Sequence, residues 1–263
     1  MTEWLGLVGK VIVVTGGSSG IGANVVADLV NLGARVAIVD RQAPAESTAA
    51  TYLPCDIADK GAVEKAFAAI EEQFGRIDGL VNSAGVNRPG LLIDYLHGDP
   101  AHELSVEDLD FHMAVNVRGA FLCAQAAGRV MIRQRSGVIV NITSEAGVDG
   151  SHGQGAYSAS KGALNSFTLT WAKELGRFNV RVIGVSPGIN ELTPMGSAEQ
   201  RAALAYARGV TAGDLALDYT KIIPLGRVGR IQEVSDLIVY AVSDRSTFIT
   251  GTTLVVSGGK SRG

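Results

Sequence analysis

The stretch Val11-Ile-Val-Val-Thr-Gly-Gly-Ser-Ser-Gly-Ile-Gly22 decides the fold of this chain. Residues 11–15 are a short, mostly β-branched run that ends at Gly16, which is typical of a buried parallel strand. A helical pattern of apolar residues follows from Ile21 to Leu32, and Gly33 is placed to end that helix. A strand, a glycine-rich turn and a helix in this order predict the opening of a βαβ unit.

The same alternation continues along the chain. Further strands are expected at 35–40, 52–57, 77–82, 137–143, 180–186 and 253–256, and further helices at 60–74, 106–133, 156–176 and 231–242. Residues 86–105 interrupt the rhythm as a surface excursion, and 187–220 as an irregular region with helical stretches. Because no repeat or linker is visible, residues 1–263 are expected to form one α/β domain, a doubly wound parallel sheet with helices on both faces.

Composition excludes several classes of protein. Of the 263 residues 46% are hydrophobic and 19% charged, with a net charge of −3. This suits a large core and disfavours disorder, and the lack of a basic stripe disfavours a nucleic-acid partner. We expect no membrane span, signal peptide or metal site, because no long apolar run, leader pattern or ligand cluster is seen. With only two cysteines, Cys55 and Cys123, a cytoplasmic protein is expected.

The glycine-rich turn predicts a dinucleotide site. Glycines at 16, 20 and 22 let the backbone turn sharply and approach a pyrophosphate, and the helix N-terminus directs N–H groups at the phosphates. Asp40 ends the second strand, where a carboxylate can bind both ribose hydroxyls and repel a 2′-phosphate. NAD is therefore the expected cofactor, although Arg41 could pair with the 2′-phosphate of NADP.

A second motif carries the chemistry. Tyr157 and Lys161 are four residues apart on a predicted helix and so share a face. An ammonium near a phenol lowers its pKa, which would make Tyr157 a general base for alcohol oxidation. Ser144 follows the fifth strand, at the sheet edge where ligands bind, and its hydroxyl could hold the substrate oxygen.

These motifs together resemble the short-chain dehydrogenase/reductase family across nearly the whole chain. The matching segments are 15–22, Cys55-Asp-Ile57, Asn82-Ser-Ala-Gly85, Asn116 before Val-Arg-Gly119, Ser144, Tyr157-x-x-x-Lys161 and Pro187-Gly188. Ser83 departs from the pattern, since a second Asn often stands there. The resemblance implies a Rossmann-type sheet of seven strands and a homotetramer.

The resemblance also assigns site residues. The catalytic set is Asn116, Ser144, Tyr157 and Lys161, with Asn116 placing a water that relays a proton from Lys161. The cofactor-binding set is Thr15, Gly16, Ser18, Ser19, Gly20, Ile21, Gly22, Asp40, Asp56, Ile57, Asn82, Ala84, Gly85, Tyr157, Lys161, Pro187, Gly188 and Ile189.

Finer similarities, such as Gly150-Ser-x-Gly-Gln154 and the tail Gly258-Gly-Lys-Ser-Arg-Gly263, resemble a subgroup that oxidises a phosphorylated polyol. The expected reaction is oxidation of D-sorbitol 6-phosphate at C2 to D-fructose 6-phosphate, in carbohydrate metabolism. A phosphate demands a cationic pocket. The candidate substrate residues are Arg88, His152, Lys260 and Arg262 for the phosphate, and Glu145 and Gln154 for other contacts.

Other functions stay open. Another sugar or polyol, a steroid or a 3-oxoacyl thioester could be the substrate. Glu145 could form a salt bridge instead of binding a hydroxyl, and His152 could simply be exposed. A nucleotide-sensing regulator or a scaffold protein would not need the tyrosine and lysine, and both are present.

Overall fold

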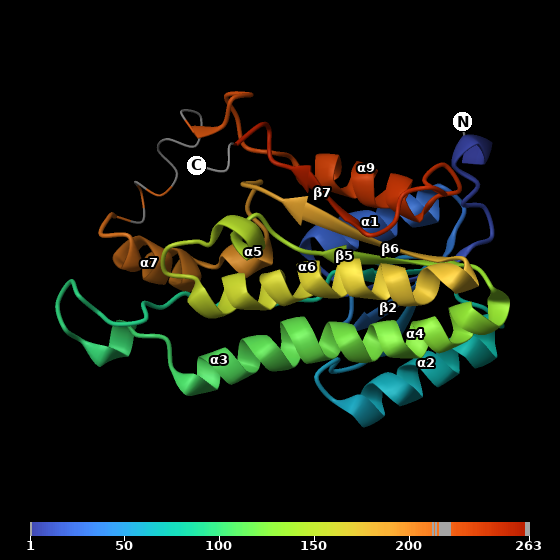
Figure 1. Cartoon of the computed structure of the whole chain (residues 1–263), viewed down its shortest axis with the longest axis horizontal. Helices are drawn as coiled ribbons and strands as arrows, with labels where there is room; N and C mark the ends of the chain where they lie inside the picture. The colour runs from blue at the N-terminus through green and yellow to red at the C-terminus, as the bar shows by residue number, and fades with distance from the viewer. Residues whose placement is uncertain (1, 212, 214, 216–221, 261–263) are drawn as a thin grey trace.

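The strands build one parallel sheet through the middle of the molecule (Figure 1). The computed structural model describes residues 2–211, 213, 215 and 222–260. In this part of the chain the sheet has seven strands in the order β3-β2-β1-β4-β5-β6-β7. The strands are β1 Val11–Thr15, β2 Arg35–Asp40, β3 Thr51–Pro54, β4 Gly79–Asn82, β5 Gly137–Ile142, β6 Val180–Pro187 and β7 Thr252–Val256. The predicted doubly wound architecture is confirmed.

Helices cover both faces of the sheet (Figure 1). On one face lie α2 (Lys60–Phe74), α4 (Ala120–Gln134) and α6 (Gly155–Leu175), and on the other lie α1 (Gly20–Asn31) and α9 (Ile231–Val242). Short helices are η1 Thr2–Leu5, η2 Pro100–His102, α3 Val106–His112, α5 Ala146–Asp149, η4 Gly176–Phe178, η5 Pro194–Gly196 and α7 Ala198–Ala207.

The mainly apolar composition of the central strands follows from this two-sided burial. Every residue of β1 is buried. Val13 packs into the cluster beneath α2 and α4, whereas Ile12 and Val14 pack into the cluster beneath α1 and α9. Successive strand side chains point to opposite faces, so a strand with two covered faces is apolar throughout.

Three predicted elements differ from the structure. The third strand ends at Pro54 instead of residue 57, because Asp56 accepts a hydrogen bond from the backbone N–H of Ala58 and starts a turn. The fourth begins at Gly79 instead of residue 77, where the Ile77 N–H bonds to the Gln134 side chain. The helix expected over 106–133 is divided into α3, a π-helical segment η3 (Met113–Gly119) and α4.

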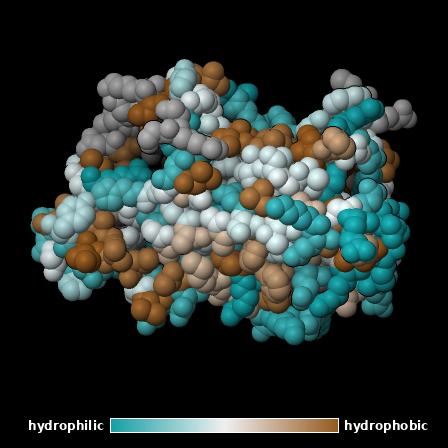
Figure 2. Space-filling view, viewed as in Figure 1, coloured by the Kyte–Doolittle hydropathy of each residue, from teal (hydrophilic) through white to brown (hydrophobic). Residues whose placement is uncertain are grey.

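The excursion at 86–105 projects from one end of the molecule, beside α7 (Figure 1). Its Leu92 is 90% exposed, and Figure 2 shows hydrophobic surface there and over the start of α3. The Tyr206 hydroxyl of α7 donates to Asp94 at 2.8 Å, and the Leu91 N–H donates to the His102 carbonyl at 3.0 Å. The excursion is thus a folded unit attached to α7.

Candidate active site

A cleft of about 530 Å³ opens at the carboxyl edge of the sheet. Ligands of open α/β sheets bind at this edge, where strand ends and helix N-termini meet. The cleft brings together predicted residues from distant segments of the chain: Gly16, Ser19, Gly20, Ile21, Gly22, Asp40, Asp56, Ile57, Ala84, Gly85, Arg88, Ser144, Tyr157, Lys161, Pro187 and Gly188.

The glycine turn is shaped to admit a phosphate-bearing ligand. Gly16 has φ +66°, and a Cβ at Gly22 would lie 2.1 Å from the Gly16 carbonyl oxygen, so neither position accepts a larger residue. Among the described residues, the Ser19 side chain makes no capping hydrogen bond to α1. The first N–H groups of α1 therefore point into the cleft with their partial positive charge available to an anion.

Asp40 lies at the carboxyl end of β2, at the rim of the cleft. Its carboxylate accepts hydrogen bonds from the backbone N–H of Ser18 and of Gln42, both at 3.1 Å. These bonds fix the carboxylate beside the glycine turn. Arg41 also borders the cleft and is exposed.

Three further cofactor candidates lie behind the cleft wall. The Thr15 hydroxyl accepts hydrogen bonds from the N–H groups of Ser83 and Ala84 at 3.2 Å, and so holds the loop after β4. Asn82 is buried and donates to Asn141 at 3.0 Å. Ile189 accepts from the Gly229 N–H at 2.9 Å. The contacts of these residues are with the protein, so they support the cleft wall.

Ser144, Tyr157 and Lys161 meet at the opposite end of the cleft, where β5 ends and α6 passes. The Ser144 hydroxyl hydrogen-bonds the Tyr157 hydroxyl. Lys161 is 3% exposed; its Nζ lies 5.7 Å from the centre of the Tyr157 ring and donates to the Ile142 carbonyl at 2.8 Å. The predicted catalytic residues are adjacent in space.

The electrostatics of this group differ from the sequence-based expectation. Burial raises the pKa of Tyr157 above its ordinary value, and the Ser144 hydrogen bond opposes this only in part. Burial also lowers the pKa of Lys161 to about 8. The Lys161 ammonium donates to the Ile142 carbonyl, and burial is the main cause of the Tyr157 shift, so the expected lowering of the Tyr157 pKa is wrong.

Asn116 sits in the π-helical turn η3 and is fully buried. Its side-chain oxygen accepts from the Val86 N–H at 2.8 Å, while its amide donates to the Val86 carbonyl and the Ser160 hydroxyl, both at 2.9 Å. A Cβ at Gly85 would contact both the Asn116 oxygen and Lys161 Nζ. The π turn thus places Asn116 beside Lys161, in keeping with the functional use of such turns.

The predicted substrate residues are spread more widely. Arg88 borders the cleft, where it pairs with Asp108 at 2.9 Å and stacks over Phe111. Glu145 forms a salt bridge with Lys260 at 2.9 Å, which joins the catalytic loop to the tail after β7.

The remaining substrate candidates lie in the approach to α6 and in the tail. His152 hydrogen-bonds Tyr95 at 3.0 Å, and Gln154 accepts from the Ser151 hydroxyl at 2.5 Å. Arg262 lies outside the described residues.

The region after β6 forms one wall of the cleft, which the sequence did not predict. Asn190, Glu191, Thr193, Met195 and Gln200 line the cleft. The side-chain oxygens of Asn87 and Asn190 are buried and, within the described chain, have no hydrogen-bond partner. Such atoms call for a ligand donor. The available signal was Ser197-x-x-Gln200, a capping box that marks the start of α7.

The described residues hold no group of three or more potential metal ligands, and no described helix is long and apolar enough to cross a membrane.

Comparison with known proteins gives one consistent family. The model of the short chain dehydrogenase family matches residues 10–203. Sorbitol-6-phosphate 2-dehydrogenase of Klebsiella pneumoniae is 43% identical, with all of both chains covered. D-threitol dehydrogenase of Mycolicibacterium smegmatis is 37% identical, over 95% of this chain and 92% of the relative.

Two further proteins extend the range of substrates. Human 3-oxoacyl-[acyl-carrier-protein] reductase is 36% identical, over 95% of this chain and 97% of the relative. Among solved structures, aldohexose dehydrogenase of Thermoplasma acidophilum superposes with a TM-score of 0.84 at 28% identity, covering 97% of this chain and 95% of that one.

Proposed function

Because the chain belongs to the short-chain dehydrogenase family, we propose that it oxidises D-sorbitol 6-phosphate to D-fructose 6-phosphate with NAD. The observation that carries this proposal is the 43% identity over the full length to a sorbitol-6-phosphate 2-dehydrogenase. The cleft supports it with a complete serine, tyrosine and lysine set at its inner end. The activity places the protein in carbohydrate metabolism.

The residues of the cleft suit a dinucleotide. Members of this family generally use NAD(P). The glycine turn lines the cleft with Gly16, Gly20 and Gly22, and the N–H groups of α1 would bind a pyrophosphate there. Asp56, Ile57, Ala84 and Gly85 would line the adenosine part, and Pro187 and Gly188 the nicotinamide part. When bound, the nicotinamide supplies the acceptor for the C2 hydride.

We assign the preference for NAD to Asp40. Its carboxylate faces the glycine turn from the rim of the cleft, where it would accept hydrogen bonds from two ribose hydroxyls. A 2′-phosphate at the same place would meet a like charge. Arg41, beside it, is the residue that would favour NADP.

Each catalytic side chain has a distinct task. Tyr157 takes the proton of the substrate hydroxyl, and Ser144 holds the oxygen of that hydroxyl by a hydrogen bond. Lys161 stabilises the phenolate, because a positive charge nearby favours the ionised form. Asn116, fixed by Val86 and Ser160 next to Lys161, places the water through which the proton leaves.

The direct test measures NADH formation by absorbance. Purified protein is given NAD with either D-sorbitol 6-phosphate or D-sorbitol, and NADP serves as the cofactor control. Rapid NADH formation with the phosphorylated polyol is the expected result. If neither polyol reacts while the protein binds NADH, the substrate assignment is overturned, and a 3-oxoacyl thioester is the next substrate to assay.

We further propose a cytoplasmic homotetramer. Both cysteines are buried free thiols, as suits a reducing compartment. Between α4 and α6 the rings of Phe121, Phe167 and Trp171 are in mutual contact, with Trp171 buried. On the outer side of these helices Phe121 is 39% exposed and Leu169 is 48% exposed. Exposed apolar patches of this kind mark subunit contacts. Light scattering of the native protein would distinguish a tetramer from a monomer.

A further inference from the structure

Helix α7 carries two arginines on its inward side. Arg201 and Arg208, the C-cap residue, are seven residues apart, which is about two helical turns, so their side chains lie on one face. Both are half-buried, and Ala205 between them is buried. This face is directed toward the protein rather than toward solvent.

Neither arginine pairs with a carboxylate of the described chain. Arg201 Nη1 donates to the Gly196 carbonyl at 2.9 Å, and Arg208 Nη2 donates to the Ser151 hydroxyl at 3.3 Å. A guanidinium has five N–H donors, so most donors of both residues are available to a ligand. Among the described residues no carboxylate balances these half-buried cations, so the two arginines are candidates for binding an anion.

Two of the cations predicted to hold the phosphate are already paired with carboxylates. Arg88 is paired with Asp108 and Lys260 with Glu145. An anionic group near either would compete with a carboxylate at 2.9 Å. The charge balance therefore favours the arginines of α7 as the anion site.

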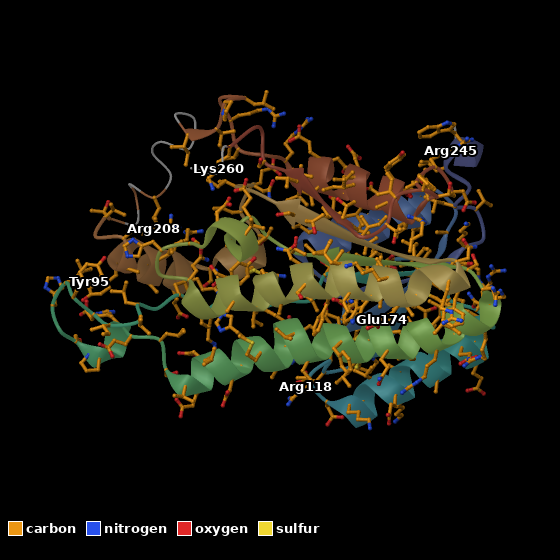
Figure 3. All side chains as sticks on the ribbon, in the orientation of Figure 1. Tyr95, Arg118, Glu174, Arg208, Arg245 and Lys260 are labelled. Carbon is orange, nitrogen blue, oxygen red and sulfur yellow. The ribbon has the colours of Figure 1, made fainter. Side chains whose placement is uncertain are left out.

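Neither arginine lines the cleft itself, so the pair suits a group several bonds away from the reacting carbon. Gln200 lines the cleft, and its amide donates to the Asn87 carbonyl at 2.6 Å. At the other end of α7, Arg208 contacts Ser151, six residues before Tyr157, and a Cβ at Gly153 would lie 2.6 Å from the Ala207 Cβ. Figure 3 shows Arg208 on α7, at the end of the molecule where α7 and the excursion meet.

We propose that Arg201 and Arg208 form the subsite that binds the phosphate of the substrate and so select phosphorylated over free polyols. This inference rests on the proposed function and adds to it the residues that determine specificity. The planar guanidinium matches the geometry of phosphate oxygens, and two such groups would neutralise a dianion.

The test compares kcat/KM for D-sorbitol 6-phosphate and for D-sorbitol in Arg201→Gln, Arg208→Gln and the double variant. Each single variant should lose about 10- to 100-fold on the phosphorylated substrate, in line with a lost charge-assisted contact, and less than about threefold on sorbitol. Arg208→Lys should recover part of the loss. Arg177→Gln, an exposed arginine at the other end of α6, is the matched control and should change neither value.

Inorganic phosphate supplies a second readout. It should inhibit the wild-type enzyme competitively with the phosphorylated substrate, and its inhibition constant should rise at least about fivefold in the double variant. An equal loss on both substrates, or a phosphate inhibition constant that does not change, overturns the subsite. A wild-type enzyme that oxidises both polyols equally well overturns the proposed function instead, and phosphate inhibition of that enzyme still decides whether the arginines bind an anion.

Discussion

Replacing Lys161 with methionine should abolish turnover and yet stabilise the fold. Lys161 is 3% exposed, and burial lowers its pKa from the ordinary 10.5 to about 8. Keeping this ammonium charged in the folded protein at neutral pH therefore costs about 3 kcal/mol of unfolding free energy. Methionine removes the charge but also the hydrogen bond to the Ile142 carbonyl, worth about 1 kcal/mol, so Lys161→Met should gain about 2 kcal/mol.

The pH dependence identifies the cause. Below about pH 8 Lys161 is charged in both the folded and the unfolded state, and the full cost is present. Between about 8 and 10.5 the unfolded state binds more protons, so the wild type becomes more stable as pH rises. The advantage of the variant should therefore shrink from about 2 kcal/mol at pH 7 to near zero at about pH 9.5.

Urea denaturation followed by tryptophan fluorescence, at one protein concentration and two pH values, measures this difference. Lys173→Met, an exposed residue of the same helix, is the control and should change stability little at either pH. A Lys161→Met variant that is less stable than the wild type by the same amount at both pH values would refute the argument from charge burial.

Three further predictions concern catalysis and the cofactor. Tyr157→Phe should lower kcat by about 10³-fold with unchanged NADH binding. Wild-type oxidation should increase as the pH rises from neutrality, because burial raises the pKa of Tyr157 and the phenolate is the base; a flat steady-state profile would contradict this. Asp40→Ser should raise the ratio of kcat/KM for NADP over NAD by about 10-fold or more, and an unchanged ratio would mean that another residue selects the cofactor. Gly22→Ala should abolish dinucleotide binding in calorimetry, because the new Cβ would lie 2.1 Å from the Gly16 oxygen, whereas Gly128→Ala, with no atom within 4 Å, should preserve it.

The sequence by itself determined the order of the elements and brought forward the serine, tyrosine and lysine of the candidate site. In runs such as Val11–Thr15 the residues on both faces of the strand are suited to burial. This pattern is typical of a parallel strand that is covered by helices on both faces. The spacing from Tyr157 to Lys161 places both residues on one helix face whatever the helix packs against. Local geometry and periodicity were sufficient for these features.

Tertiary structure decided the contacts and pKa values that depend on segments far apart in the sequence. In the π turn the Asn116 side chain is bound by Val86 and Ser160, which are 30 and 44 residues away in the sequence, and no local pattern predicts those partners. Burial raises the pKa of Tyr157 more than its hydrogen bond with Ser144 lowers it, although the spacing to Lys161 alone suggested a lowered pKa.

The charge balance at the substrate end was likewise set by the fold. Glu145 and Lys260 are 115 residues apart in the chain, yet their pairing neutralises both. Among the described residues the arginines of α7 have no carboxylate partner, whereas Arg88 and Lys260 are each paired. The pairing of charged side chains depends on long-range packing, and the periodicity of the sequence carries no information about that pairing.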